Sequence, residues 1–239
     1  MRITVLQPES YVPLDRFGSW LRAGAELEVV LLEEQAPPSL EEVGDALVVL
    51  GGRMDSCDDT RSPWLPAVRA LLRDAVAAEK PTLGICLGHQ ILATALGGEV
   101  AVGIEEMAEE GAFRISWSDD ALTDPLVGAL AADGVGLVAE SHHDAVTRLP
   151  ARAVLLASSE RCPVQAFRVG SAVGVQFHPE ASPERMARWT AGHGGDGDAM
   201  LDEMRAADEQ VARLGEGLAT AFLDVVRRSL RPGLPAVGA

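Results

Sequence analysis

The stretch PTLGICLGHQILATALGGEV, residues 81–100, decides the fold of this chain. It begins as a short apolar strand and runs directly into a helix over residues 87–96. The junction has the pattern Gly84-x-Cys86-x-Gly88. Glycines are needed on both sides because the strand and helix backbones pass close together at such a sharp turn. The pattern predicts a nucleophile elbow with Cys86 at its tip.

A cysteine at this position points along the N-terminus of the following helix. The free N–H groups and the helix dipole at that end favour the thiolate, which is the nucleophilic form of cysteine. A buried structural cysteine in an ordinary strand–turn–helix unit is the alternative. The elbow alone does not separate the two interpretations. A partner base elsewhere in the chain would favour the nucleophilic cysteine.

Length and composition argue against several classes of protein. The 239 residues are 47% hydrophobic, enough to bury one full core as a single domain. A net charge of −16 without a basic run argues against nucleic acid and anionic membranes as partners. No apolar run is long enough to span a membrane, and the N-terminus lacks the apolar core of a signal peptide. We expect a cytoplasmic protein.

The reactive residue types are few. Three widely spaced cysteines, Cys57, Cys86 and Cys162, make neither a disulfide framework nor a zinc ligand set. The only lysine, Lys80, excludes a P-loop and leaves little room for Schiff-base chemistry. We therefore expect no metal site and no cofactor.

The first hundred residues alternate strands with helices. The expected elements are strand 2–7, a short helix near residues 17–21, strand 27–32, strand 46–50 and helix 64–79. This alternation predicts a parallel sheet with helices on both faces. Ligands of such sheets bind at the carboxyl ends of the strands, which is where Gly51-Gly52 and Cys86 lie.

The pattern beyond residue 100 changes to short strands separated by turn residues. The candidates are residues 99–102, 112–117, 136–140, 153–158, 164–169 and 172–177. Gly170-Ser171 predicts a hairpin between the last two. A helix is expected to begin at Pro183.

The C-terminal part contains a glycine-rich run and a long amphipathic segment. Residues 191–197, AGHGGDG, have the composition of a flexible linker that includes His193. Residues 198–228 predict one long helix. Its apolar stripe is Met200, Met204, Ala207, Val211, Leu214, Leu218, Phe222 and Val225. We expect one domain over residues 1–190, and a segment over residues 191–239 whose helix packs on that domain, with a partner surface as the alternative.

His178 and Glu180 follow the last strand and lie two residues apart, so their side chains leave the same face. A histidine oriented by a carboxylate is the partner that a cysteine nucleophile needs. The imidazole takes the thiol proton and returns it to the leaving group, while the carboxylate sets the ring orientation. His89, just past the elbow, is expected on the helix surface, with a place behind Cys86 as the alternative.

GICLGHQ (84–90) and GVQFHPE (174–180) together resemble the class I, or triad, glutamine amidotransferases. The nearest resemblance is to free-standing bacterial members similar to the glutaminase half of GMP synthase. LGGRMDSCDD, SHHDAVTRLP and VLLASSERCPVQAFRVG extend the resemblance to nearly all of residues 1–189. It implies a flavodoxin-like three-layer α/β sandwich with a central, mostly parallel sheet. It also implies hydrolysis of the side-chain amide of L-glutamine to glutamate and ammonia through a cysteine thioester.

The resemblance also implies roles for individual residues. Cys86 matches the nucleophile, His178 the general base and Glu180 the carboxylate that orients it. The backbone N–H groups of Gly52 and Leu87 match the oxyanion hole. The positions that match substrate contacts are Gln90, Ser141, His142, His143 and Asp144.

Three departures from the family pattern are present. Ala112 replaces a tryptophan often seen in the family, and the other two leave local features open. Arg53 stands where many relatives have proline, so the loop is expected either to be looser or to reach towards the substrate. His143 replaces a glycine, which puts a left-handed backbone angle there in doubt.

The ammonia needs an acceptor, and the chain has no ATP-binding motif and no room for a synthetase domain. We expect a separate synthetase to accept it, or no acceptor at all; the oligomeric state is open and includes a homodimer. Two alternatives remain. One is a γ-glutamyl amide hydrolase on the same scaffold, and the other is a catalytically silent regulatory subunit.

Overall fold

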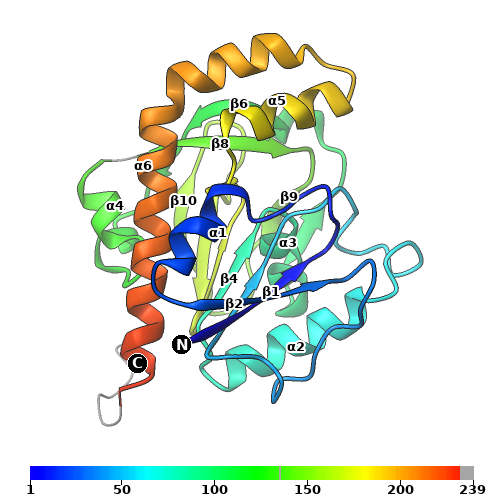
Figure 1. The fold of residues 1–239 in the computed structure, drawn as a ribbon, viewed down its shortest axis with the longest axis vertical. Coiled ribbons are helices and arrows are strands. Elements are labelled where there is room, and N and C mark those ends of the chain that lie inside the picture. The colour runs from blue at the N-terminus through cyan, green and yellow to red at the C-terminus, as the bar shows by residue number, and fades with distance from the viewer. Residues whose placement is uncertain (135, 232–239) are drawn as a thin grey trace.

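The computed structural model describes residues 1–134 and 136–231 and is built around one central sheet (Figure 1). The strands in sheet order are β2 (Glu26–Leu31), β1 (Arg2–Gln7), β3 (Ala46–Val49), β4 (Thr82–Ile85), β12 (Ala172–Val175), β11 (Ala166–Val169), β10 (Val154–Ser158) and β7 (Ser116–Trp117). Neighbouring strands from β2 to β12 are parallel, and the remaining pairs are antiparallel. The predicted flavodoxin-like α/β fold is confirmed.

Helices cover both faces of this sheet, which makes three layers (Figure 1). The helices are α1 (Asp15–Arg22), α2 (Leu65–Ala77), α3 (Leu87–Ala95), α4 (Gly128–Ala132), α5 (Pro183–Gly192) and α6 (Gly197–Ser229). Successive side chains of β3 enter opposite cores, because side chains alternate along a strand. Val48 packs in the core that contains α1, α4 and α6, while Leu47 and Val49 pack in the core that contains α2 and α3.

Two small antiparallel sheets lie outside the central one. β5 (Glu99–Ala101) pairs with β9 (Ala145–Arg148), and β6 (Glu109–Arg114) pairs with β8 (Leu137–His142). The sequence analysis missed β9 and α4, and joined β6 and β7 into one strand. All four elements are short, and the strands among them pair with strands remote in the sequence, so hydrophobic periodicity alone does not define them.

Helix α3 is buried along nearly its whole length rather than on one face. The prediction that His89 lies on its surface is wrong, since His89 is fully buried and its ring centroid is 4.9 Å from that of Phe167. Gly174 leaves the space for this ring, because a Cβ there would come within 2.7 Å of His89 Nδ1. Burial lowers the pKa of His89 to about 3 and keeps the ring neutral.

Helix α6 runs the length of the molecule and packs against α5, α1, β6 and β8 (Figure 1). Its buried residues are Met200, Met204, Val211, Leu214, Gly215, Leu218, Ala219, Phe222, Leu223 and Val226. The glycine-rich run forms the end of α5 and a short connection to α6. The division of the chain at residue 190 stays a prediction. Within the described residues, no helix combines the length and apolar character needed to cross a membrane.

Replacing Phe222 by alanine should destabilise the fold, because the ring is 1% exposed in the core beneath α6. We expect a loss of about 3–5 kcal/mol in the free energy of unfolding, measured by urea denaturation. Leu230, next to the end of the same helix, is 49% exposed, so Leu230→Ala should cost less than about 0.5 kcal/mol. Equal losses in the two variants would mean that α6 is not anchored by this core.

Candidate active site

Cys86 sits at the turn between β4 and α3 with φ of 50° and ψ of −105°. A non-glycine residue with this backbone conformation is strained, and such strain is found mainly at functional sites. Two hydrogen bonds hold it, from Cys86 N to Val175 O at 2.8 Å and from Gln90 N to Cys86 O at 3.1 Å. A Cβ at Gly88 would lie 2.1 Å from Val49 O, so the close approach that requires glycine is present.

His178 and Glu180 lie on the segment between β12 and α5, and both are buried. His178 Nδ1 is 2.7 Å from Glu180 Oε1. The backbone N–H of His178 donates to Ala139 O of β8 at 2.8 Å. The ring centroid of His178 is 4.7 Å from that of Trp189 on α5. These contacts orient the imidazole with its Nδ1 towards the carboxylate.

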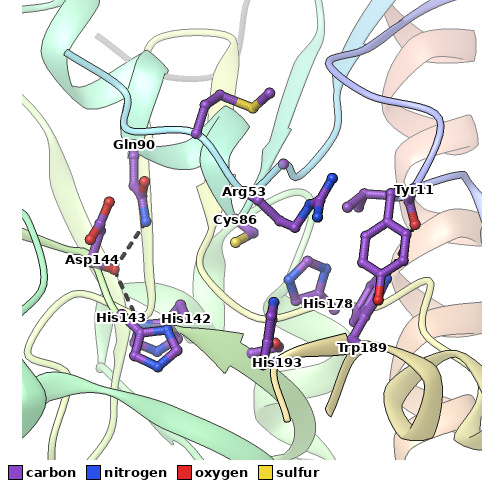
Figure 2. Close-up of a pocket in the computed structure, with 14 residues that line it drawn as sticks. Tyr11, Arg53, Cys86, Gln90, His142, His143, Asp144, His178, Trp189 and His193 are labelled. Carbon is purple, nitrogen blue, oxygen red and sulfur yellow. Dashed lines mark hydrogen bonds between the residues drawn. The ribbon is translucent and has the colours of Figure 1, made fainter. Parts of the chain in front are cut away.

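The structure brings Cys86 and His178 to the same pocket, although they are remote in the sequence (Figure 2). Both lie against Gly51, where a Cβ would be 2.9 Å from His178 Cε1 and 3.5 Å from Cys86 Cβ. Burial alone lowers the pKa of His178, but the charges of Glu180 and Cys86 outweigh it and hold that pKa well above its ordinary value. A protonated imidazole beside the sulfur is therefore favoured.

The residues predicted for the oxyanion hole also lie together. Leu87 is the first residue of α3, so its N–H has no acceptor within the helix. Gly52 lines the pocket, and a Cβ on it would be 2.9 Å from Leu87 Cδ2. Gly52 and Leu87 are therefore neighbours beside Cys86, and their role as oxyanion donors stays a prediction.

The predicted substrate contacts Gln90, Ser141, His142, His143 and Asp144 all line this pocket. Gln90 Nε2 donates to Asp144 O at 2.9 Å, and His142 Nδ1 lies 3.2 Å from the same carbonyl (Figure 2). Since a carbonyl only accepts, Nδ1 of His142 is the donor. His143 is exposed and is not among the described residues with positive φ, so no left-handed angle is needed there.

Gln176 contacts Cys86 and His193 lines the pocket, but no role at the site was predicted for either from the sequence. Gln176 is fully buried, and its Nε2 lies 3.6 Å from Cys86 Sγ while its Oε1 accepts from Gln90. It stands inside the quoted motif GVQFHPE and was passed over beside His178. His193, expected only as a linker residue, lines the pocket because α5 and α6 bring their connection over it.

Arg53 is tied down rather than loose. Its guanidinium donates to both carboxylate oxygens of Glu9, with Nη2 to Oε2 at 2.7 Å and Nε to Oε1 at 3.2 Å. Its backbone N–H also donates to Glu9 Oε1, and the guanidinium lies 4.5 Å from the ring centroid of Tyr11 (Figure 2). Glu9 is 3% exposed, so this pair holds the loop after Gly52 in place.

A buried group of polar side chains lies behind His142. Glu109, Glu140 and His142 place one ligand-type atom each within 4.8 Å of one another. Glu109 already accepts hydrogen bonds from Gln165 Nε2 at 2.6 Å and Ser159 Oγ at 2.7 Å. Burial, and then the charge of Glu109, raise the pKa of Glu140 well above its ordinary value and favour its neutral form.

The chain matches the model of the class-I glutamine amidotransferase family over residues 19–190. The chain therefore belongs to the class-I glutamine amidotransferases. GMP synthase (glutamine-hydrolyzing) from Cronobacter sakazakii is 35% identical over 142 residues, and that from a strain of Escherichia coli is 36% identical over 143. Each match covers 58% of this chain and 26% of the relative, so this amidotransferase spans about a quarter of their length.

Solved structures of the family extend the likeness to nearly the whole chain. A glutamine amidotransferase from Thermotoga maritima has a TM-score of 0.76 at 25% identity, covering 95% of this chain and 97% of that one. A second, from Methylobacillus flagellatus, has a TM-score of 0.79 at 26% identity, covering 94% of each chain. Both matches extend beyond residue 190, so the amidotransferase fold in these relatives includes most of the region that α6 occupies here.

Replacing Glu180 by glutamine should lower the pKa of His178, because burial then acts without the opposing carboxylate charge. The ring of His178 should change from protonated to neutral at a lower pH than in the parent protein. An NMR titration of histidine-labelled protein measures this, with His178→Gln to assign the signal. Glu184→Gln, at an exposed position on α5, is the matched control and should leave the midpoint in place. The same midpoint in Glu180→Gln and the parent would contradict the assigned pairing.

Proposed function

We propose that this amidotransferase hydrolyses the side-chain amide of L-glutamine to glutamate and ammonia through a thioester on Cys86. The observation that carries the proposal is the shared pocket of a strained elbow cysteine and a buried histidine whose Nδ1 is 2.7 Å from the Glu180 carboxylate. This arrangement supplies a nucleophile, a base and a group that orients the base. Family membership supports the same reaction class.

The reaction begins when His178 takes the thiol proton and the Cys86 thiolate attacks the amide carbon. The N–H groups of Gly52 and Leu87 stabilise the oxyanion of the tetrahedral intermediate. His178 then gives its proton to the departing nitrogen, which leaves as ammonia, and a glutamyl thioester remains. Water, deprotonated by His178, attacks the thioester carbon. The C–S bond breaks, and the sulfur regains a proton as glutamate leaves.

Substrate contacts in this proposal come from residues on the opposite side of the pocket from His178 (Figure 2). Gln90 and the 141–144 segment line that side and are joined through the Asp144 carbonyl (Figure 2). Hydrogen bonds to the amino-acid end of glutamine from this rigid group would hold the amide carbon near Cys86 Sγ.

The ammonia goes to a synthetase on a separate protein in this proposal. The GMP synthases similar to this chain are about four times its matched length, and their names include glutamine hydrolysis. The acidic chain, with its free cysteines, fits an enzyme of the cytoplasm. Ammonia release with and without candidate synthetases, and copurification of a synthetase with this chain, test the partner.

Replacing Cys86 by serine should reduce ammonia release from glutamine by at least about 10³-fold, because the thiolate nucleophile is lost. The fold should be unchanged, as monitored by circular dichroism. Cys57→Ser, at an exposed position, is the matched control and should retain full activity. Retained glutaminase activity in Cys86→Ser would refute the assignment.

Two further measurements separate this function from its alternatives. A panel of glutamine and γ-glutamyl amides should give the highest kcat/KM with glutamine, and a preference for γ-glutamyl compounds would indicate a different hydrolase. Diazo-oxo-norleucine, an electrophilic mimic of glutamine, should label Cys86 stoichiometrically. An unlabelled Cys86 would identify a silent subunit.

A further inference from the structure

The turn that carries His178 and Glu180 lies beyond the end of the central sheet, and the bond from His178 N to Ala139 O of β8 holds its first residue. Strand β12 ends at Val175, and α5 begins only at Pro183. Glu180 makes its hydrogen bond through Oε1, while its Oε2 has no hydrogen-bond partner among the described residues. The position of the turn therefore depends on what packs against it.

Helix α6 packs directly on the middle of this turn. A Cβ at Gly215 would lie 2.2 Å from the carbonyl oxygen of Pro179 and 2.9 Å from Trp20 Cζ3. The first contact is with backbone, which cannot rotate away as a flexible side chain can. Glycine at position 215 thus allows the α6 backbone to lie against the residue between His178 and Glu180, and any larger residue has to displace the turn or the helix.

Helix α1 holds the residues that follow Glu180. Arg16 donates to the carbonyl oxygen of Ala181, and its Nη1 lies 2.6 Å from Asp208 Oδ1 on α6. Asp15 accepts from Ser182 N at 2.9 Å and from Ser182 Oγ at 2.7 Å. The Arg16 and Asp208 side chains are only 19% and 37% exposed, so this ion pair is partly shielded from water. The turn is therefore held between α1 and α6.

The residues that make these contacts, Asp15, Arg16, Asp208 and Gly215, lie outside residues 19–190, which the family match covers. We propose that Gly215, Arg16 and Asp208 are positioning residues that hold the 178–180 turn at the distance from Cys86 needed for proton transfer. Helix α6 is then part of the active-site framework. This inference rests on the proposed glutaminase function.

Gly215→Ala tests the proposal against Gly217→Ala on the same helix. A Cβ at Gly217 would meet only Leu130 Cδ2 at 2.7 Å, the end of a side chain that can rotate. Gly215→Ala should lower kcat by about 10²-fold with KM unchanged, because the base moves while the substrate contacts stay. The pH dependence of kcat/KM should also change, since a longer contact with Glu180 lowers the pKa of His178. Gly217→Ala should match the parent protein in both measurements.

Arg16→Met provides a second variant in case Gly215→Ala does not fold. It keeps the apolar stem and removes the contacts to Ala181 and Asp208. It should reduce kcat in the same direction, and Arg16→Lys should recover part of the loss. Arg205→Met is the matched control, because Arg205 pairs with Glu184 at 3.0 Å between α6 and α5, with side chains 57% and 62% exposed. A parent-like kcat and pH profile in folded Gly215→Ala, or in Arg16→Met, would overturn the proposal.

Alkylation of Cys86 by iodoacetamide separates this proposal from the glutaminase function. In a Cys57→Ser background, the pH dependence of the alkylation rate reports the proximity of His178 without any substrate. If the parent protein is inactive on glutamine but its alkylation profile still changes with Gly215→Ala, the glutaminase function is refuted and the positioning role is supported. If the parent protein is active and the two proteins have identical alkylation profiles, the glutaminase function is supported and the positioning role is refuted.

Discussion

The close approach of strand β4 and helix α3 at Cys86 is the constraint on which the rest of the structure depends. It forces a positive φ of 50° on a residue that has a side chain, and it excludes a Cβ from Gly84, where a Cβ would lie 2.6 Å from Gly88 O. The strain is tolerated because β4 lies inside the sheet, between β3 and β12. Strands β3 and β12 end at the same edge of the sheet as β4. The segments that follow them therefore place Gly51-Gly52 and His178 near the sulfur of Cys86.

A buried network of amides connects this edge to the other side of the pocket. Gln176 lies between Cys86 Sγ and Gln90, and Gln90 reaches the carbonyl of Asp144, which His142 also contacts. Buried polar groups that are paired in this way restrict one another, because breaking any one contact leaves a donor or acceptor unsatisfied. The network gives the floor of the pocket a single arrangement, which a site that must orient a small amide requires.

The sequence was sufficient for the features that local pattern determines. The elbow follows from two glycines around Cys86, and the parallel sheet follows from apolar runs such as residues 46–50. His89 and His193 could not be placed, because their environments are made by Gly174, Phe167 and the α5–α6 connection, which are remote in the chain. The Arg53 ion pair could not be predicted either, because it depends on the burial of Glu9, which no local sequence pattern indicates.

The charge balance around Cys86 follows from this geometry. Glu180 faces His178, so the pair is neutral when the imidazole is protonated. Glu109 accepts hydrogen bonds from Ser159 Oγ and Gln165 Nε2. Glu140 is the buried acid whose pKa burial and Glu109 raise, and as a neutral group it adds no second negative charge near the sulfur. Glu180 and Cys86 favour a protonated imidazole at His178, which is the group that delivers the proton to the leaving nitrogen in the proposed mechanism.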